Sequence, residues 1–184
     1  AFSAGLAISN LGAKIAYSES GNSDFLPTNF KIGGGYHLEI DDYNMLSVYL
    51  DINRLLVPTP PQLGTDGEII AGVDTDDMTP LIGAAQSFNP GAKPGGFTEM
   101  LQENIYNFGL EYRYNDFLFA RGGYLNEHKL KGNRQYVTLG FGLVYNVFSI
   151  DMAYLIPASP TTRSPLENTV RFSMAFNIDG FLAQ

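Results

Sequence analysis

The sequence has no cysteine, only two histidines and no long apolar run. Without cysteine, neither a disulfide framework nor a thiolate metal site is available. No segment approaches the ~18–20 apolar residues that a spanning helix needs, so only β-structure is left as a way to cross a bilayer. His37 falls in an alternating segment and His128 in a connection, whereas a Ser-His-Asp site needs three converging side chains. We therefore expect no enzyme activity, no metal and no cofactor.

Positive charge is also scarce. The net charge is −8, and residues 57–103 contain seven acidic residues against a single lysine, Lys93. A nucleic-acid surface needs a basic patch that neutralises phosphates, so we expect no nucleic-acid partner. The chain begins AFSAG, without an initiator methionine or the basic and apolar segments of a secretory signal. We expect a processed or truncated chain.

What the sequence does contain is strict alternation of apolar and polar residues. In NTVRFSMAFNI, Val170, Phe172 and Met174 fall on one face, while Arg171 and Ser173 fall on the other. A period of two residues is typical of a strand with two unlike faces. The alternating segments, which we predict to be strands, are 1–9, 28–40, 44–53, 104–114, 117–126, 135–146, 147–156 and 168–178.

Ionisable residues such as Glu111 and Arg121 recur on the second face of most of these segments, and the first face carries no charge at neutral pH. A soluble barrel with an apolar interior fits this alternation as well as a membrane barrel with an apolar exterior does. Aromatic residues near one end of the segments, as in an interfacial girdle, favour the membrane barrel. Segments of ~9–11 residues also suit a tilted membrane strand. The interior of the barrel would then hold a polar network of Glu39, Asp51, Glu111, Arg113, Arg121, Asp151 and Arg171.

The connections alternate in length. Tight links at 41–43, 115–116 and 146–147 are rich in Asn and Asp, and the others are long: 10–27, 57–103, 127–134 and 157–167. In an antiparallel meander all tight turns lie at one rim, as do the short periplasmic turns of outer-membrane barrels. The long loops would be extracellular and the C-terminus periplasmic. We predict an all-β, transmembrane antiparallel β-barrel, with residues 1–184 in one domain.

The connection 57–103 is far longer than usual, which indicates a functional or a disordered segment. It either docks a partner or folds over the mouth of its own barrel. The acidic run of Asp74, Asp76 and Asp77 lacks the glycine and the downstream glutamate of a calcium loop, so a solvated turn is favoured. The partner-binding candidates are Val57, Pro58, Pro60, Pro61, Leu63, Ile69, Ile70, Phe88 and Phe97.

Four stretches carry a resemblance to a known family. GLAISNLGAKIAYSES (5–20), DFLPTNFKIGGGYHLEIDDYN (24–44), LDINRLLVPTPP (50–61) and RGGYLNEHKL (121–130) resemble the C-terminal half of PorV-type outer-membrane barrel proteins of type IX secretion. These proteins fall within the long-chain fatty-acid transporter-like barrel family. The resemblance implies a fourteen-stranded barrel of which the eight segments would be the last strands.

The resemblance also implies a function without catalysis. Such proteins bind the translocon barrel and the C-terminal signal domains of secreted cargo, and deliver cargo to the cell-surface sortase and attachment complex. This implies a location in the bacterial outer membrane, in contact with its lipid. Two alternatives remain open: a transporter that passes hydrophobic small molecules such as fatty acids, and a complete eight-stranded barrel, a size at which closed barrels exist.

Overall fold

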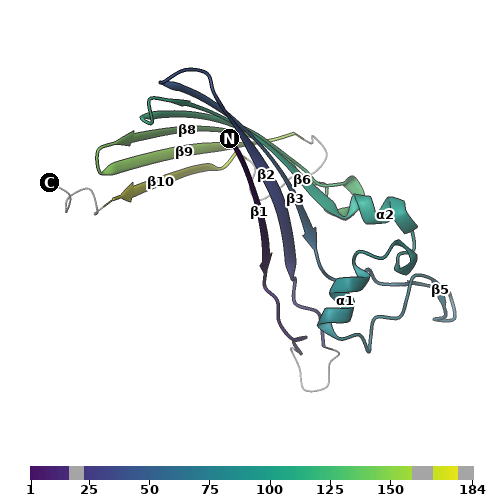
Figure 1. Cartoon of the computed structure of the whole chain (residues 1–184). Helices are drawn as coiled ribbons and strands as arrows, with labels where there is room; N and C mark the ends of the chain where they lie inside the picture. Colours follow the sequence, from purple (N-terminus) through teal and green to yellow (C-terminus); the bar gives the residue numbers. More distant parts are fainter. Residues whose placement is uncertain (17–22, 159–167, 178–184) are drawn as a thin grey trace. The chain divides into compact units, whose positions relative to one another are not determined.

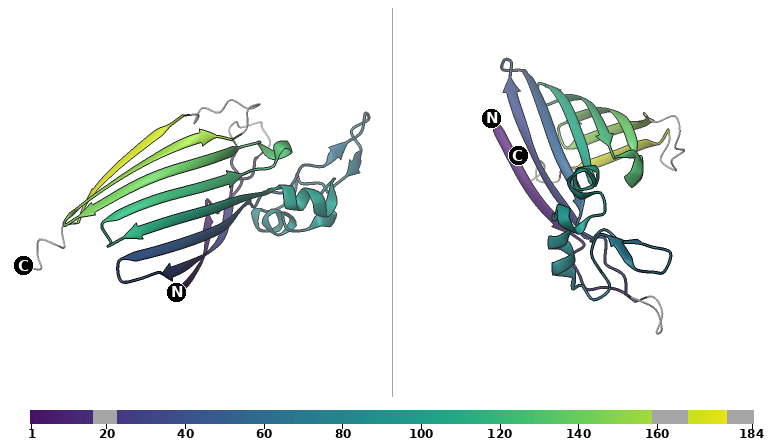
Figure 2. Two further views of the ribbon diagram at one scale, coloured as in Figure 1. Left: turned by 90° about the horizontal axis from the view of Figure 1, so that it is seen from above. Right: turned by 90° about the vertical axis from the view of Figure 1, so that its right-hand side faces the viewer.

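The computed structural model describes residues 1–16, 23–158 and 168–177, and these residues form mainly β-structure (Figures 1 and 2). Most of the strands belong to one eight-stranded sheet with the order β1-β2-β3-β6-β7-β8-β9-β10. Their bounds are β1 Phe2–Ser9, β2 Asn29–Glu39, β3 Asn44–Leu55, β6 Asn104–Tyr114, β7 Leu118–Asn126, β8 Gln135–Tyr145, β9 Phe148–Pro157 and β10 Val170–Phe176.

The eight predicted strands are confirmed, each within a few residues of its predicted bounds. The segment 104–114 matches β6 at both ends, and β3 runs two residues beyond the predicted end at Asn53. β10 ends at Phe176, and the predicted end at Ile178 lies outside the described residues. The alternation is a local signal, which explains why it located the strands so closely.

The predicted barrel is confirmed only as an antiparallel sheet. β1 and β10 stand at the two ends of the strand order, and among the described residues no pairing between them closes the sheet. Every residue of both strands is exposed, on the polar as well as the apolar face. A strand with one neighbour leaves a row of backbone donors and acceptors unpaired, which is a template for further strand pairing.

The chain divides into two compact units. The sheet unit contains residues 1–5, 33–51 and 106 onward, and the insert unit contains 6–32 and 52–105. Within the insert unit lies the long connection 57–103, called the insert below. It contains the short strands β4 (Gln62–Leu63) and β5 (Ile69–Ala71), the helices α1 (Pro80–Gln86) and α2 (Gly96–Gln102), and the 3-10 turn η1 (Pro90–Ala92).

In the sheet unit, the tight turns lie along one edge, as the alternating loop lengths predict. The backbone N–H of Asn115 donates to the carbonyl of Tyr43 across 2.7 Å, so the first two tight turns are neighbours. At the third turn, Val147 accepts a 2.8 Å bond from Asn177, directly after β10. Asn115 and Asp116 both have positive φ, a conformation that Asn and Asp tolerate better than other L-residues. Which side of a membrane this edge faces remains a prediction.

The turn between β2 and β3 depends on one carboxylate. Asp41 Oδ1 accepts bonds from the backbone N–H groups of Tyr43 (2.9 Å) and Asn44 (2.8 Å) and from the Asn44 side chain. The Tyr43 bond, followed by the Asn44 side chain, lowers the pKa of Asp41 below its ordinary 3.8. The ionised carboxylate therefore fixes the turn.

Acid is expected to loosen this turn. Because the folded-state pKa of Asp41 is lowered, its stabilising effect is complete above the unfolded pKa and is lost as pH falls through the folded value. Carboxyl-carbon NMR of the protein in detergent micelles should give a midpoint below 3.8, and amide exchange at Asn44 should accelerate below that midpoint. A midpoint at or above the ordinary value would contradict this account of the turn.

Among the described residues, no helix is both long and apolar enough to cross a membrane.

Candidate functional site

Two features of the described residues are candidates for function: the two faces of the sheet unit and the surface of the insert. In β6, the apolar residues Phe108, Leu110 and Tyr112 are exposed, while Glu111 and Arg113 between them are half-buried. Soluble proteins show the opposite arrangement. Elsewhere on the apolar face Leu139 is 54% exposed. The face that the sequence predicts to contact lipid is therefore uncovered.

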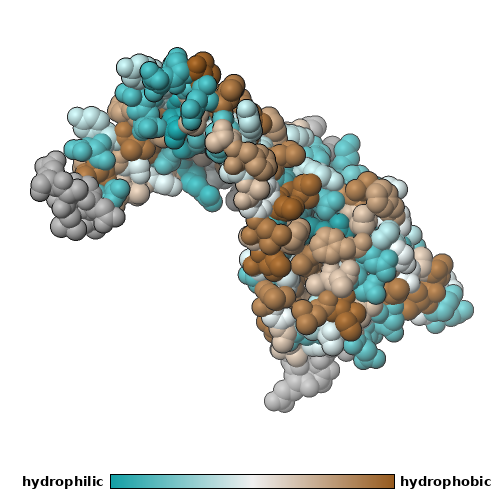
Figure 3. All heavy atoms as spheres, viewed as in Figure 1, coloured by the Kyte–Doolittle hydropathy of each residue, from teal (hydrophilic) through white to brown (hydrophobic). Residues whose placement is uncertain are grey.

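Figure 3 shows apolar side chains, in brown, gathered along the strands around β1 and β2. Many large hydrophobic side chains are exposed, whereas only Leu56, Ala92 and Tyr136 are buried hydrophobic residues in the part of the chain that the structure describes. A contiguous exposed apolar surface marks a site of contact with membrane or protein.

Aromatic residues lie at the tight-turn edge of the sheet unit. Phe148 and Phe176 make an edge-to-face contact with their ring centroids 5.1 Å apart, and Phe117 contacts Tyr145 at 6.4 Å. Aromatic residues form girdles at the interfaces of outer-membrane barrels, where tyrosine places its apolar ring toward lipid and its hydroxyl toward water. The position predicted for an aromatic girdle is thus occupied.

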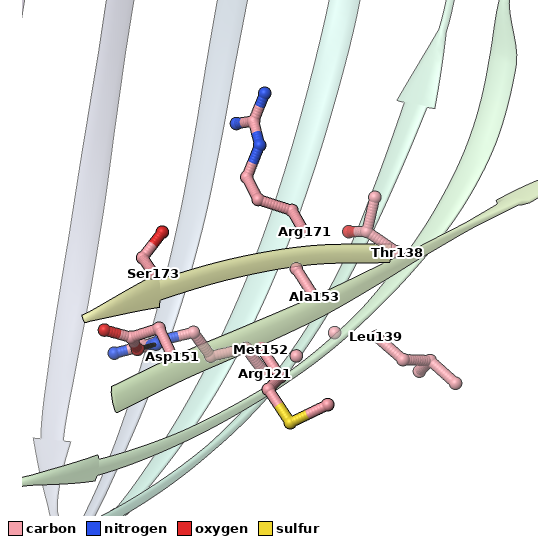
Figure 4. A pocket seen from close by; sticks show the side chains of 10 residues that line it. Arg121, Thr138, Leu139, Asp151, Met152, Ala153, Arg171 and Ser173 are labelled. Carbon is pink, nitrogen blue, oxygen red and sulfur yellow. Dashed lines mark hydrogen bonds and ion pairs between the residues drawn. The ribbon is translucent and has the colours of Figure 1, made fainter. Parts of the chain in front are cut away.

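On the polar face, three of the predicted network residues meet. Arg121 on β7 lies 2.6 Å from Glu111 on β6 and also pairs with Asp151 on β9. Figure 4 shows Arg171 and Ser173 pointing to one side of the sheet, while Leu139 and Met152 point away from it. Arg121, Asp151 and Arg171 line a shared open pocket on this face. The network places its charges where they neutralise one another, which lowers the cost of withdrawing them from water.

Glycines in β8 make room for this network. Arg121 pairs in register with Gly140, and Asp151 with Gly142, so the ion pair between Arg121 and Asp151 crosses over β8. A Cβ at Gly142 would lie 2.6 Å from Asp151 Oδ1 and 3.0 Å from the Arg121 guanidinium. The absence of a side chain at this position is therefore what permits the crossing.

Gly142→Ala is expected to displace the ion pair between Arg121 and Asp151 and to destabilise the sheet by up to about 1 kcal/mol, because both side chains are partly exposed and can move aside. The matched control is Gly122→Ala, because a Cβ there meets nothing within 4 Å. Denaturant unfolding of the full-length protein in micelles gives the unfolding midpoint of each variant. Equal midpoints for the two variants would show that the crossing contributes nothing to stability.

The other predicted network residues are dispersed. Asp51 lines a second pocket together with Glu111 and Arg121. Arg113 pairs at 3.0 Å with Asp116, and with Glu39 it lines a pocket beside the tight turns. Arg171 is exposed and has no ionic partner among the described residues. Of the seven predicted residues, Glu111, Arg121 and Asp151 are thus joined by ion pairs in the described part of the chain, and a polar barrel interior stays a prediction.

In the insert unit, a second ionic cluster is buried. Arg54, at the end of β3, is 3% exposed and lies 2.9 Å from Glu103, and Lys93 is 4% exposed and lies 2.6 Å from the same carboxylate. Thr59 donates to Glu103 and accepts from Lys93. We call Arg54, Thr59, Lys93 and Glu103 the buried cluster.

Within the insert unit, the buried cluster ties both helices to the last residues of β3. The Arg54 guanidinium donates to the carbonyls of Ser87, directly after α1, and of Met100 in α2. Both helices are only seven residues long, and helices this short are unstable in isolation. Tertiary contacts of this kind therefore position them. Sequence analysis missed Arg54, because it lies one residue beyond the predicted strand end, although the isolated Lys93 in an acidic segment was a usable signal.

Close packing also fixes α1. Gly83 is buried, and a Cβ there would lie 2.7 Å from Phe25 and 3.0 Å from Pro58. Phe88 contacts Phe30 edge to face, with centroids 5.8 Å apart. These contacts fix one side of the helical part of the insert and leave the other side exposed.

The predicted partner-binding residues separate by exposure. Pro60, Leu63, Ile69, Ile70, Phe88 and Phe97 are exposed, Val57 and Pro61 are half-buried, and Pro58 is buried against α1. The exposed residues are accessible to a partner without any change in the insert. Pro58 packs against α1. Whether any of these residues binds a partner remains a prediction.

The polar candidates outside these two features serve local structure. Asp74 accepts from the backbone N–H of Asp76, and in the described residues no group of three or more ligating side chains suits a metal ion. His37 lies between the hydroxyls of Ser3 (3.1 Å) and Ser47 (2.9 Å). In the connection after β7, Glu127 accepts two bonds from the Arg134 guanidinium, and these bonds raise the pKa of that guanidinium.

Fold and surface thus define an all-β protein whose antiparallel sheet exposes an apolar face and pairs its charges on the other. Residues 1–62 match a family model described as "Type IX secretion system protein PorV". No curated protein matches the chain. The match covers the first third of the chain and includes three of the four stretches that carry the resemblance. It does not test whether this is the C-terminal half.

Proposed function

We propose that this chain is part of a non-enzymatic outer-membrane barrel that serves type IX protein secretion. The observation that carries the proposal is the inverted sheet: apolar side chains such as Leu139 and Phe172 are exposed, and Arg121 is paired on the opposite face. A protein with this arrangement is stable where its apolar face meets lipid. The family match over residues 1–62 supplies the link to type IX secretion.

The sheet would form the last eight strands of a fourteen-stranded barrel. The unpaired edges of β1 and β10 support this, because each exposes backbone groups that cannot remain unsatisfied in a bilayer. In this arrangement the tight-turn edge is periplasmic and the insert is extracellular. One barrel domain then contains the whole of residues 1–184.

At the cell surface, the barrel binds the translocon and the C-terminal signal domains of secreted proteins, and transfers cargo to the sortase and attachment complex. The exposed apolar residues of the insert, among them Leu63, Ile70 and Phe97, supply the contact. The alternative, a transporter of fatty acids or similar molecules, ranks second because the ion pairs of Glu111, Arg121 and Asp151 occupy the polar face.

Co-purification of the full-length protein with the translocon barrel and with a cargo signal domain tests this function. Deleting residues 62–100 should abolish both associations. Because the deletion also removes Lys93 from the buried cluster, a second variant replaces the exposed Leu81 and Phe97 with serine and leaves the cluster intact. The matched control is Leu130→Ser, which changes an exposed leucine in the long connection 127–134. Undiminished association of both insert variants would refute the docking role.

A further inference from the structure

The surface of the insert combines exposed apolar side chains with charge of a single sign. Leu81 is 72% exposed and Ile70 is 66% exposed. In Figure 3 brown and teal side chains lie next to one another around β5. The exposed apolar residues of the insert include Leu63, Ile69, Ile70, Leu81, Ile82 and Phe97, and its exposed acidic residues are Asp66, Glu68, Asp74, Asp76 and Asp77.

No cation of the insert offsets these carboxylates at the surface. Lys93 is the only lysine or arginine between residues 57 and 103, and its side chain is 1% exposed and paired with Glu103. The nearby Lys14 donates to the backbone carbonyl of Asp76 across 2.7 Å. The exposed surface of the insert therefore has a negative potential next to apolar area.

Resting on the function proposed above, we infer that the insert binds a protein surface whose apolar patch is bordered by lysine and arginine. Burial of the apolar residues drives the association, and the acidic residues select and orient a basic partner. An anionic lipid surface and a second copy of this chain both carry negative charge and would be repelled. The acidic stretch around Asp74 thus acts in partner selection.

The buried cluster prepares this surface before the partner arrives. Arg54 fixes the end of α1 through Ser87 and fixes α2 through Met100, so the exposed residues Leu81 and Phe97 are placed by the protein itself. Ordering a loop on binding reduces affinity, and a surface that is already ordered avoids that loss. Because Lys93 is buried in the cluster and paired with Glu103, the only positively charged side chain of the insert is kept away from the surface that would meet a basic partner.

The experiment measures binding of the full-length protein in nanodiscs to the purified translocon barrel. One variant replaces Asp74, Asp76 and Asp77 with asparagine, which retains the side-chain oxygen that accepts from the Asp76 N–H. The matched control replaces Asp42 and Asp116 with asparagine, because both are exposed acidic residues at the tight-turn edge. Association and dissociation rates are measured at 50 and 500 mM NaCl, because the Debye screening length falls from about 14 Å to about 4 Å over this range.

The asparagine variant is expected to bind about tenfold more weakly, mainly through slower association, and to lose most of the salt dependence of the wild type. The control should bind as the wild type does. Unchanged or tighter binding of the asparagine variant, or competition by anionic vesicles, would overturn the inference while leaving the docking function intact. Absence of binding by the wild-type protein would overturn the proposed function as well.

Discussion

Phe172→Arg is expected to prevent most of the protein from folding in the outer membrane. Phe172 is 58% exposed on the apolar face of β10, where it pairs with Met152 near the middle of β9. If this face meets lipid, an arginine there costs about 2–4 kcal/mol near the bilayer midplane. The folded fraction is measured from the heat-modifiable band of the full-length protein in outer-membrane preparations.

The control for this variant is Ser173→Arg, one residue along the same strand. Ser173 is also exposed, lies on the polar face and pairs in register with Asp151, so a new guanidinium there meets a carboxylate. We expect near-normal folding. If both variants fold equally well, or if the serine variant is the more damaging, the apolar face does not contact lipid and the outer-membrane proposal fails.

Glu103→Gln is expected to release the helices of the insert. It leaves the buried Arg54 and Lys93 without their shared carboxylate, and breaking a buried ion pair in this way costs about 3–5 kcal/mol. The Arg54 guanidinium holds the carbonyls of Ser87 and Met100 by hydrogen bonds, so its displacement should make α1 and α2 susceptible to protease while the sheet stays resistant. Limited proteolysis with mass spectrometry locates the new cleavage sites.

Asp116→Asn provides the comparison, because it removes the carboxylate of an arginine pair whose acidic partner is 81% exposed. Exposed pairs contribute only ~0–1 kcal/mol. Its proteolysis pattern should match that of the wild type. Protection of α1 and α2 in the Glu103 variant would show that packing around Gly83 and Phe88 positions the helices without help from the cluster.

The strands and their two faces were predictable because the signal is local. Alternation in segments such as 104–114 depends only on residues next to one another in the chain, because successive side chains of a strand point to opposite faces. Asn and Asp at positions such as Asn115 mark turns, because these residues tolerate positive φ. The tight turns predicted three of the strand pairings, β2 with β3, β6 with β7 and β8 with β9. What the sequence could not locate was the internal structure of the insert, whose short helices have no amphipathic period long enough to read.

The sequence by itself determined that this protein is β-structured, with an apolar face and an ionisable face, because side-chain direction repeats every two residues whatever surrounds the strand. Only the tertiary structure decided which charges meet. Arg54 and Glu103 are 49 residues apart in the chain, and Arg121 reaches Asp151 across a glycine on an intervening strand. Such contacts depend on strand register and on the space between side chains, which alternation along a single strand does not specify.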